Sequence, residues 1–170
     1  MTKLNDLSNF DERFEESICV HRTTTSTEQP VRKISKGRLM VAFHGTVTVQ
    51  LNDKCYDIPQ GYYAWIPKDA AHRIVTSGEV VDVADIVYPT WLIRSKPRKK
   101  VHVFPIPTLL RSMLELLEKT DQELFPLDWR YGMLMTLIEN LQGRLKYRRR
   151  KSLPEKVQDT ITFGKMAKWI

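Results

Sequence analysis

The chain has few of the residues that hold small secreted or metal-stabilised domains together. Only two cysteines, Cys19 and Cys55, occur among its 170 residues, too few for a four-cysteine metal site or a disulfide framework. Both lie among strand-forming residues and are interpreted as small buried side chains in a reducing compartment. The N-terminus has no apolar signal segment, and no run approaches the roughly 18 apolar residues of a membrane helix. We therefore expect a cytoplasmic protein.

The positive charge of the chain is concentrated in a few places. Lys and Arg number 27 against 20 Asp and Glu, which gives a formal net charge of +7. The excess lies in residues 94–100, in 146–151 and near the C-terminus, whereas residues 1–17 are acidic. Such clusters are typical of solvated loops and of helix C-termini, although they can also attract a phosphate backbone. Hydrophobic residues make up 42% of the chain, enough to fill one core.

Residues 18–88 carry the pattern of short β-strands. Apolar side chains recur at every second position, as in Leu39, Val41 and Phe43. Turn signals follow at short intervals, among them His44-Gly45 and Ser77-Gly78. Many short strands with close turns predict an antiparallel barrel or sandwich. The proline-rich residues 91–107 are interpreted as an extended connector that leaves the barrel.

The pattern changes to that of amphipathic helices after Pro107. Thr108 is predicted to cap a first helix, and Asp128 a longer one that ends in the basic residues 146–151. Both helices carry more apolar side chains than one small barrel is expected to cover, which predicts self-association. The residues predicted to form the interface of a homodimer are Leu110, Leu114, Leu134 and Leu141.

One string is specific enough to indicate a family. It is Pro59-x-Gly61-x-x-x-Trp65-Ile66-Pro67-x-x-x-x-His72, and it resembles the second motif of the cupin superfamily. Residues 37–51 resemble the paired strands of the first cupin motif, and the Trp-Ile-Pro form is typical of cupin domains in AraC-type transcription regulators. The resemblance implies a mainly β fold with some helix: a cupin double-stranded β-helix, or jelly-roll barrel, followed by C-terminal helices.

The resemblance continues beyond the barrel. Residues 104–111 resemble the start of the first linker helix of AraC-type regulators, and Leu153-Pro154 resembles the dipeptide before their DNA-binding domain. Residues 162–170 resemble the first helix of their first helix-turn-helix. The implied organisation is, in order, an N-terminal arm (1–17), a cupin barrel (18–90), a connector (91–107), dimerisation and linker helices (108–151), and the start of an incomplete helix-turn-helix domain (152–170).

The resemblance implies an effector-sensing and dimerisation domain that is not an enzyme and that reaches DNA through a C-terminal domain mostly absent from this sequence. The residues predicted to face a small effector inside the barrel are Phe43, Val49, Tyr63, Trp65 and His72. No metal or other cofactor is expected, because Arg32 and Ile34 stand where metal-binding cupins carry a histidine pair, and one imidazole does not make a metal site.

Two other functions fit parts of the sequence. A metal-free cupin enzyme, such as a sugar epimerase or isomerase, would use His72 with Asp69 and with Tyr62 or Tyr63. A nucleic-acid binder would use the basic residues 144–151, with Arg148, Arg149, Arg150 and Lys151 acting on phosphates. No recognition element accompanies that run, so we expect such binding to be weak, indifferent to sequence and sensitive to salt.

Overall fold

The computed structural model describes residues 15–94, 99–117 and 120–150, with the backbone alone for 143–150. The predicted arm up to residue 14 and the predicted helix-turn-helix segment 152–170 lie outside this part. In chain order the elements are β1 (Ile18–Thr23), β2 (Thr27–Glu28), β3 (Gly37–Leu51), β4 (Lys54–Ile58), β5 (Tyr62–Ile66), β6 (Arg73–Tyr88), the 3-10 helix η1 (Thr90–Leu92), β7 (His102–Pro105), α2 (Thr108–Glu115), β8 (Gln122–Leu124) and α3 (Trp129–Arg150).

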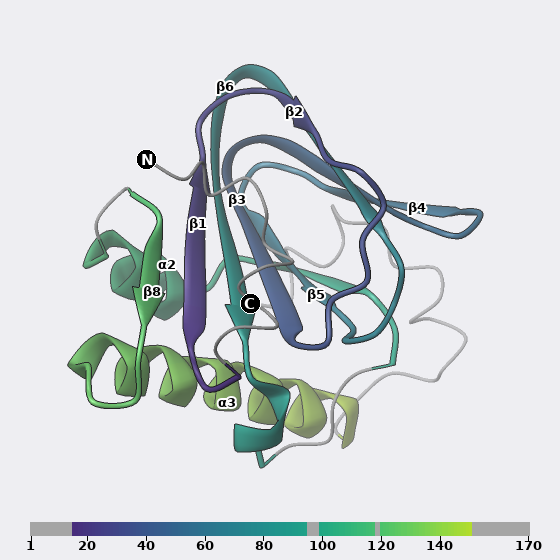
Figure 1. Ribbon diagram of the computed structural model, residues 1–170. Helices are drawn as coiled ribbons and strands as arrows, with labels where there is room; N and C mark the ends of the chain where they lie inside the picture. Colours follow the sequence, from purple (N-terminus) through teal and green to yellow (C-terminus); the bar gives the residue numbers. More distant parts are fainter. Residues whose placement is uncertain (1–14, 95–98, 118–119, 151–170) are drawn as a thin grey trace.

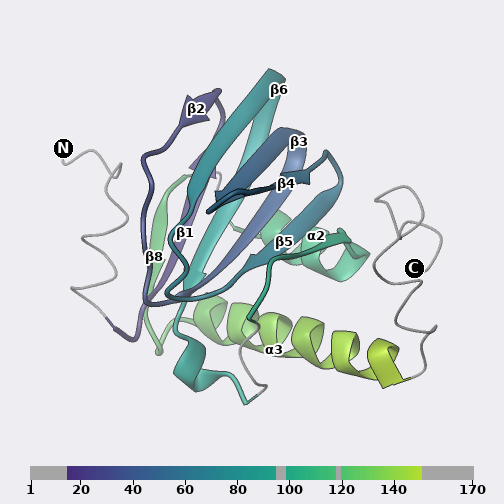
Figure 2. The ribbon, with the colours of Figure 1, turned by 90° about the vertical axis from the view of Figure 1, so that its right-hand side faces the viewer.

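The strands form one antiparallel sheet in the order β7-β5-β3-β6-β1-β8. The short strand β2 pairs with β6, and β4 pairs with β3. The two long strands, β3 and β6, form the centre of the sheet, and α3 runs across the strands below them (Figure 1). The view in Figure 2 shows β4 and β2 on the part of the sheet farthest from α3. The result is the β-rich jelly-roll fold with two helices that the cupin resemblance implied.

The two long strands bend together at a pair of glycines. The register of β3 and β6 shifts on both sides of His44, where Gly45 adopts a left-handed φ of 81° and Gly78 a φ of 140°. A Cβ atom on Gly78 would lie 3.2 Å from the Cα of Gly45, so the strands approach closely only because both residues lack side chains. The sequence predicted chain-reversing turns here. The structure has bulges instead, and both strands continue through them.

The bulge in β3 changes which face of the sheet the odd-numbered residues occupy. Before the bulge, Leu39, Val41 and Phe43 pack in a cluster with residues of α2 and α3. After it, Val47 and Val49 pack in a second cluster with residues of β4 to β7 and Val101. That second cluster contains no helical residue and forms the interior of the jelly roll. The extra residue of a bulge reverses the alternation of side chains along a strand.

Two segments outside the predicted barrel add strands to it. His102–Pro105, part of the predicted connector, pairs with β5 as the edge strand β7. Gln122–Leu124 pairs with β1 as the opposite edge strand β8. Both segments are short, and their partners lie far away in sequence, so local patterning gave no indication of the pairing.

The two predicted helices are present. α2 begins at Thr108, with Pro107 rather than Thr108 as its N-cap residue. At the start of α3, Asp128 Oδ1 accepts a hydrogen bond from the backbone N–H of Arg130 at 3.0 Å, which is the capping role predicted for Asp128. No helix within the described residues is long and apolar enough to cross a membrane.

Candidate functional site

The interior of the jelly roll contains a buried ion pair. The Arg38 guanidinium donates from Nε to Asp85 Oδ1 at 2.8 Å and from Nη2 to Asp85 Oδ2. Both residues are only 1% exposed. They sit on the central strands β3 and β6, on the same face as Met40 and Val83 of the interior cluster. A bidentate pair of this kind satisfies both charges with fixed geometry, which a buried charge requires.

Two further side chains complete this network around Arg38. Arg38 Nη2 donates to Gln29 Oε1 at 3.2 Å, and Arg38 Nη1 lies 2.7 Å from His72 Nε2. Because a guanidinium can only donate, Nε2 of His72 must be the acceptor. The other ring nitrogen, Nδ1, then carries the proton and donates to the carbonyl of Ala70 at 2.7 Å. The geometry therefore fixes His72 as a neutral imidazole with its hydrogen on Nδ1.

The environment of His72 opposes its protonation. Burial, and then the charge of Arg38, lower the pKa of His72 below its ordinary value of 6.5. Protonation would place an imidazolium N–H against the Arg38 N–H and break that contact. The network is thus stable only while His72 is neutral.

This arrangement makes a prediction about acid stability. Below pH 6.5 the unfolded chain binds a proton at His72 that the folded chain does not, so the free energy of unfolding should fall as the pH drops toward the lower folded-state pKa. One proton gives a slope of at most about 1.4 kcal/mol per pH unit. Urea unfolding between pH 5 and 8, a window around the ordinary histidine pKa of about 6.5, measures the slope. His72→Gln should flatten it and the exposed His44→Gln should not; an equal slope in all three proteins would refute the assignment.

The network also bears on the alternative of a metal-free enzyme. Both ring nitrogens of His72 are engaged, by Arg38 and by Ala70, so neither is open to act as a general base. Tyr63 belongs to the cluster on the helical side of the sheet, the opposite face from His72. Asp69 lies in a tight turn with a positive φ of 61°. No three His, Cys, Asp or Glu side chains gather at metal-ligand distance within the described residues.

The residues predicted to face an effector are divided between two places. Val49 lies in the interior cluster, and His72 is held in the Arg38 network. Phe43, Tyr63 and Trp65 pack on the other face, under α2 and α3. The sequence placed all five inside the barrel, and the bulge at Gly45 explains part of the difference. The structure thus does not gather the five around one interior space, and effector binding remains a prediction.

Four aromatic side chains form a row on the helical face of the sheet. We use the name aromatic row for Phe104, Tyr63, Trp65 and Tyr88. The ring centroids of Tyr63 and Trp65 are 6.1 Å apart and those of Trp65 and Tyr88 6.0 Å, each pair edge to face. Tyr63 and Phe104 pack at 5.8 Å across β5 and β7. Edge-to-face contacts of this kind favour a fixed arrangement of rings.

At one end of the aromatic row, a glycine makes room for the ring of Tyr88. Gly37 pairs with Tyr88 across β3 and β6, and a Cβ atom at Gly37 would lie 2.4 Å from Cζ of the Tyr88 ring. Only glycine lets the ring lie against the strand there. Phe43, also on this face, has the guanidinium carbons of Arg22 and Arg111 at 5.1 and 5.7 Å from its ring centre.

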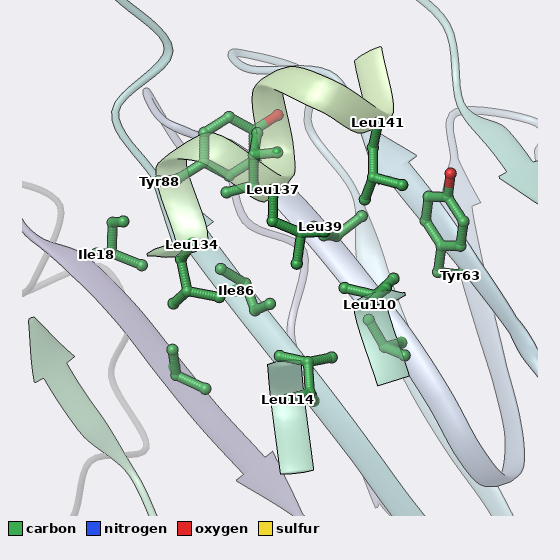
Figure 3. Packing of buried hydrophobic residues seen from close by; sticks show 14 of the residues in the cluster. Ile18, Leu39, Tyr63, Ile86, Tyr88, Leu110, Leu114, Leu134, Leu137 and Leu141 are labelled. Atoms are coloured by element: carbon green, nitrogen blue, oxygen red, sulfur yellow. The ribbon is translucent and has the colours of Figure 1, made fainter. Parts of the chain in front are cut away.

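The four leucines predicted at a dimer interface are buried within the chain itself. Leu110 and Leu134 are fully buried, and Leu114 and Leu141 are 1% and 4% exposed. Figure 3 shows them directed toward Leu39, Ile86 and Tyr63 of the sheet. The sheet is larger than predicted, because β7, β8 and both long strands extend it, and it covers the inner faces of both helices. These leucines therefore belong to the intramolecular core, a correction to the predicted interface.

The predicted phosphate-binding residues cannot be placed in the same way. Arg148, Arg149 and Arg150 lie in the last part of α3, where the structure describes only the backbone, and Lys151 lies outside the described residues. The weak, salt-sensitive attraction to nucleic acid remains a prediction from the sequence.

Sequence reasoning did not identify Arg38 and Asp85 as buried polar residues. The sequence nevertheless carried a sign of them, because each is a single charged residue beside or within an apolar strand segment. Arg38 stands at the start of a strand whose next five residues are apolar, and Asp85 stands alone in the apolar run from Val83 to Val87. A single charge within a run of buried strand residues implies an opposite charge nearby. Which two charges meet depended on the pairing of β3 with β6, which no local pattern contains.

The fold and this packing define a jelly-roll domain with a helical layer on one face of the sheet. No family model matches the chain. It is 32% identical over 56 residues to the HTH-type transcriptional regulator NimR of Escherichia coli K12, an alignment that covers 33% of this chain and 20% of NimR.

Among solved structures, ToxT of Vibrio cholerae matches with a TM-score of 0.52 and 11% identity, over 78% of this chain and 57% of ToxT. A cupin-2 domain protein of Shewanella frigidimarina matches at 16% identity with a TM-score of 0.37, over 48% of this chain and 71% of that protein. The chain thus spans a fifth of NimR and somewhat more than half of ToxT. The partial likeness to NimR is a likeness to a transcriptional regulator, in agreement with the resemblance noted in the sequence, and the likeness to ToxT is one of fold.

Proposed function

We propose that this chain is the effector-sensing and dimerisation domain of an AraC-type transcription regulator. The observation that carries the proposal is the likeness to NimR, an HTH-type transcriptional regulator, in a chain whose motifs and fold are those of a cupin. The likeness to ToxT supports the fold: a jelly-roll sheet with two helices on one face. DNA reading would belong to a helix-turn-helix domain beyond the described residues.

Sensing in this proposal couples an effector to the helical layer. The interior of the jelly roll is filled with aliphatic side chains, and the Arg38–Asp85 pair lies on the same face of the sheet. The helical face carries the larger aromatic side chains and ends in α3, which leads toward the proposed DNA-binding domain. An effector that changes how α3 packs on the sheet would therefore act directly on the proposed DNA-binding domain.

Dimerisation needs an exposed apolar surface, and the structure offers one at the start of α3. Phe125, Leu127 and Trp129 are 45%, 103% and 66% exposed, and we call them the β8–α3 patch. Three large apolar side chains in five residues are unusual for a surface exposed to water. We therefore assign the proposed dimer contact to this patch.

The test is analytical ultracentrifugation of the chain over a range of concentrations. The unmodified chain should sediment as a dimer, and Leu127→Ser with Trp129→Ser should weaken association at least about tenfold, because exposed Trp and Leu are typical anchors of an interface. The matched control is Val80→Ser, which removes a 64% exposed side chain from the sheet instead. An unmodified chain that stays monomeric at every concentration would overturn the dimerisation half of the proposal.

A further inference from the structure

Two buried polar atoms in the layer between the sheet and α3 have no hydrogen-bond partner. Trp65, which is 2% exposed, has an unpaired Nε1–H, and Gln142, which is 5% exposed, has an unpaired Oε1. A buried polar group without a partner is rare in folded proteins, because it has lost its bonds to water and gained none in return. One of these groups is a donor and the other an acceptor, and each needs an explanation.

Both groups border the same side chain, Tyr88. The Trp65 and Tyr88 rings pack edge to face, and Gln142 Nε2 donates to the Tyr88 hydroxyl at 3.4 Å. Figure 3 shows Tyr88 on the sheet beside Leu137, which precedes Gln142 by five residues on α3. The surroundings are otherwise apolar, with Leu39, Leu137 and Leu141 in the same cluster. The open N–H comes from the sheet and the open carbonyl from the helix.

We propose that this place, between the aromatic row and α3, binds a small uncharged ligand with an apolar body and one hydroxyl group. The ligand oxygen would accept the Trp65 Nε1–H, and its hydroxyl hydrogen would be donated to Gln142 Oε1. An uncharged ligand suits this place, because the described cluster residues around it are hydrophobic. The inference rests on the proposed effector-sensing function and gives it a location outside the barrel interior.

The layer between the sheet and the helices contains side chains that can rearrange to admit a ligand. Three of the five partly buried residues that pack against this cluster are methionines, Met113 on α2 and Met133 and Met135 on α3. Met side chains are unbranched and repack readily, so they can move without displacing the sheet. A ligand that bonds to Trp65 and Gln142 at once would tie α3 to the sheet, which is how occupancy would be transmitted along α3.

The test uses phenol as the probe and toluene as its control, because the two have the same shape and only phenol has the hydroxyl. The full chain is labelled with 15N, and the indole N–H signal of Trp65 is assigned by its loss in Trp65→Phe. Phenol should shift this signal downfield and saturate, and toluene should bind at least about tenfold more weakly. Gln142→Leu should remove the difference between phenol and toluene, and the exposed Gln60→Leu should leave it unchanged.

Three results would overturn the site. Phenol could leave the Trp65 indole signal in place. The indole could show exchange with a trapped internal water that phenol does not displace, in which case water serves both groups. An effector could bind the chain with equal affinity when Gln142 is replaced by Leu, which would keep the sensing function and refute this location. A monomeric chain would count against the proposed function alone, because binding at this place needs only one subunit.

Discussion

Replacing Asp85 with Asn is expected to lower the free energy of unfolding by about 3–5 kcal/mol, a large share of the stability of a domain this size. The substitution leaves the Arg38 guanidinium, 1% exposed, without its opposite charge. Asn also replaces one of the two carboxylate acceptors with an NH₂ donor, which faces another donor. Urea unfolding monitored by circular dichroism measures the loss.

Two further variants show whether the charge is the cause. Arg38→Met combined with Asp85→Leu removes both charges and should recover much of the loss, since a buried pair exchanged for apolar residues is often close to neutral. The recovery should be incomplete, because His72 Nε2 and Gln29 Oε1 lose their donor. Glu28→Gln, which breaks the exposed pair with Arg73, should cost no more than about 1 kcal/mol. If Asp85→Asn unfolded at the same urea concentration as the unmodified chain, the Arg38–Asp85 pair would have to be accessible to water.

Replacing Leu134 with Ala is expected to lower the free energy of unfolding by about 2–5 kcal/mol, and Leu134→Lys to prevent folding. Leu134 is fully buried between α3 and the sheet. A shorter side chain leaves a cavity there, and a lysine cannot reach water from that position. The matched control is Leu116→Ala, which shortens a 63% exposed leucine at the end of α2 and should change stability by no more than about 0.5 kcal/mol.

The Leu134→Lys variant also distinguishes the intramolecular core seen in the structure from the dimer interface predicted from the sequence. If Leu134 lay between two subunits, Leu134→Lys would give a folded, soluble monomer. If it lies in the intramolecular core, the chain should lose its folded circular dichroism spectrum altogether. A folded monomer would restore the four leucines to the dimer interface.

The local patterns determined much of the fold. Alternating β-branched and aromatic residues predicted an antiparallel β-rich domain, and the motif from Pro59 to His72 indicated a cupin. The change of periodicity after Pro107 predicted both helices, including the capping role of Asp128. These features follow from neighbours within about one turn or one hairpin, where propensity, capping and turn chemistry act.

The pairing of distant segments was decided by tertiary structure alone. Sequence periodicity cannot show that β7 and β8 extend the sheet, that the glycines at 45 and 78 face each other, or that Arg38 meets Asp85 across 47 positions. The bulge at Gly45 then set Phe43 on the helical face of the sheet and Val49 on the interior face. A register shift of one residue moves every following side chain to the other face of a strand, so local motifs could indicate a resemblance to a family but not the location of the buried polar groups.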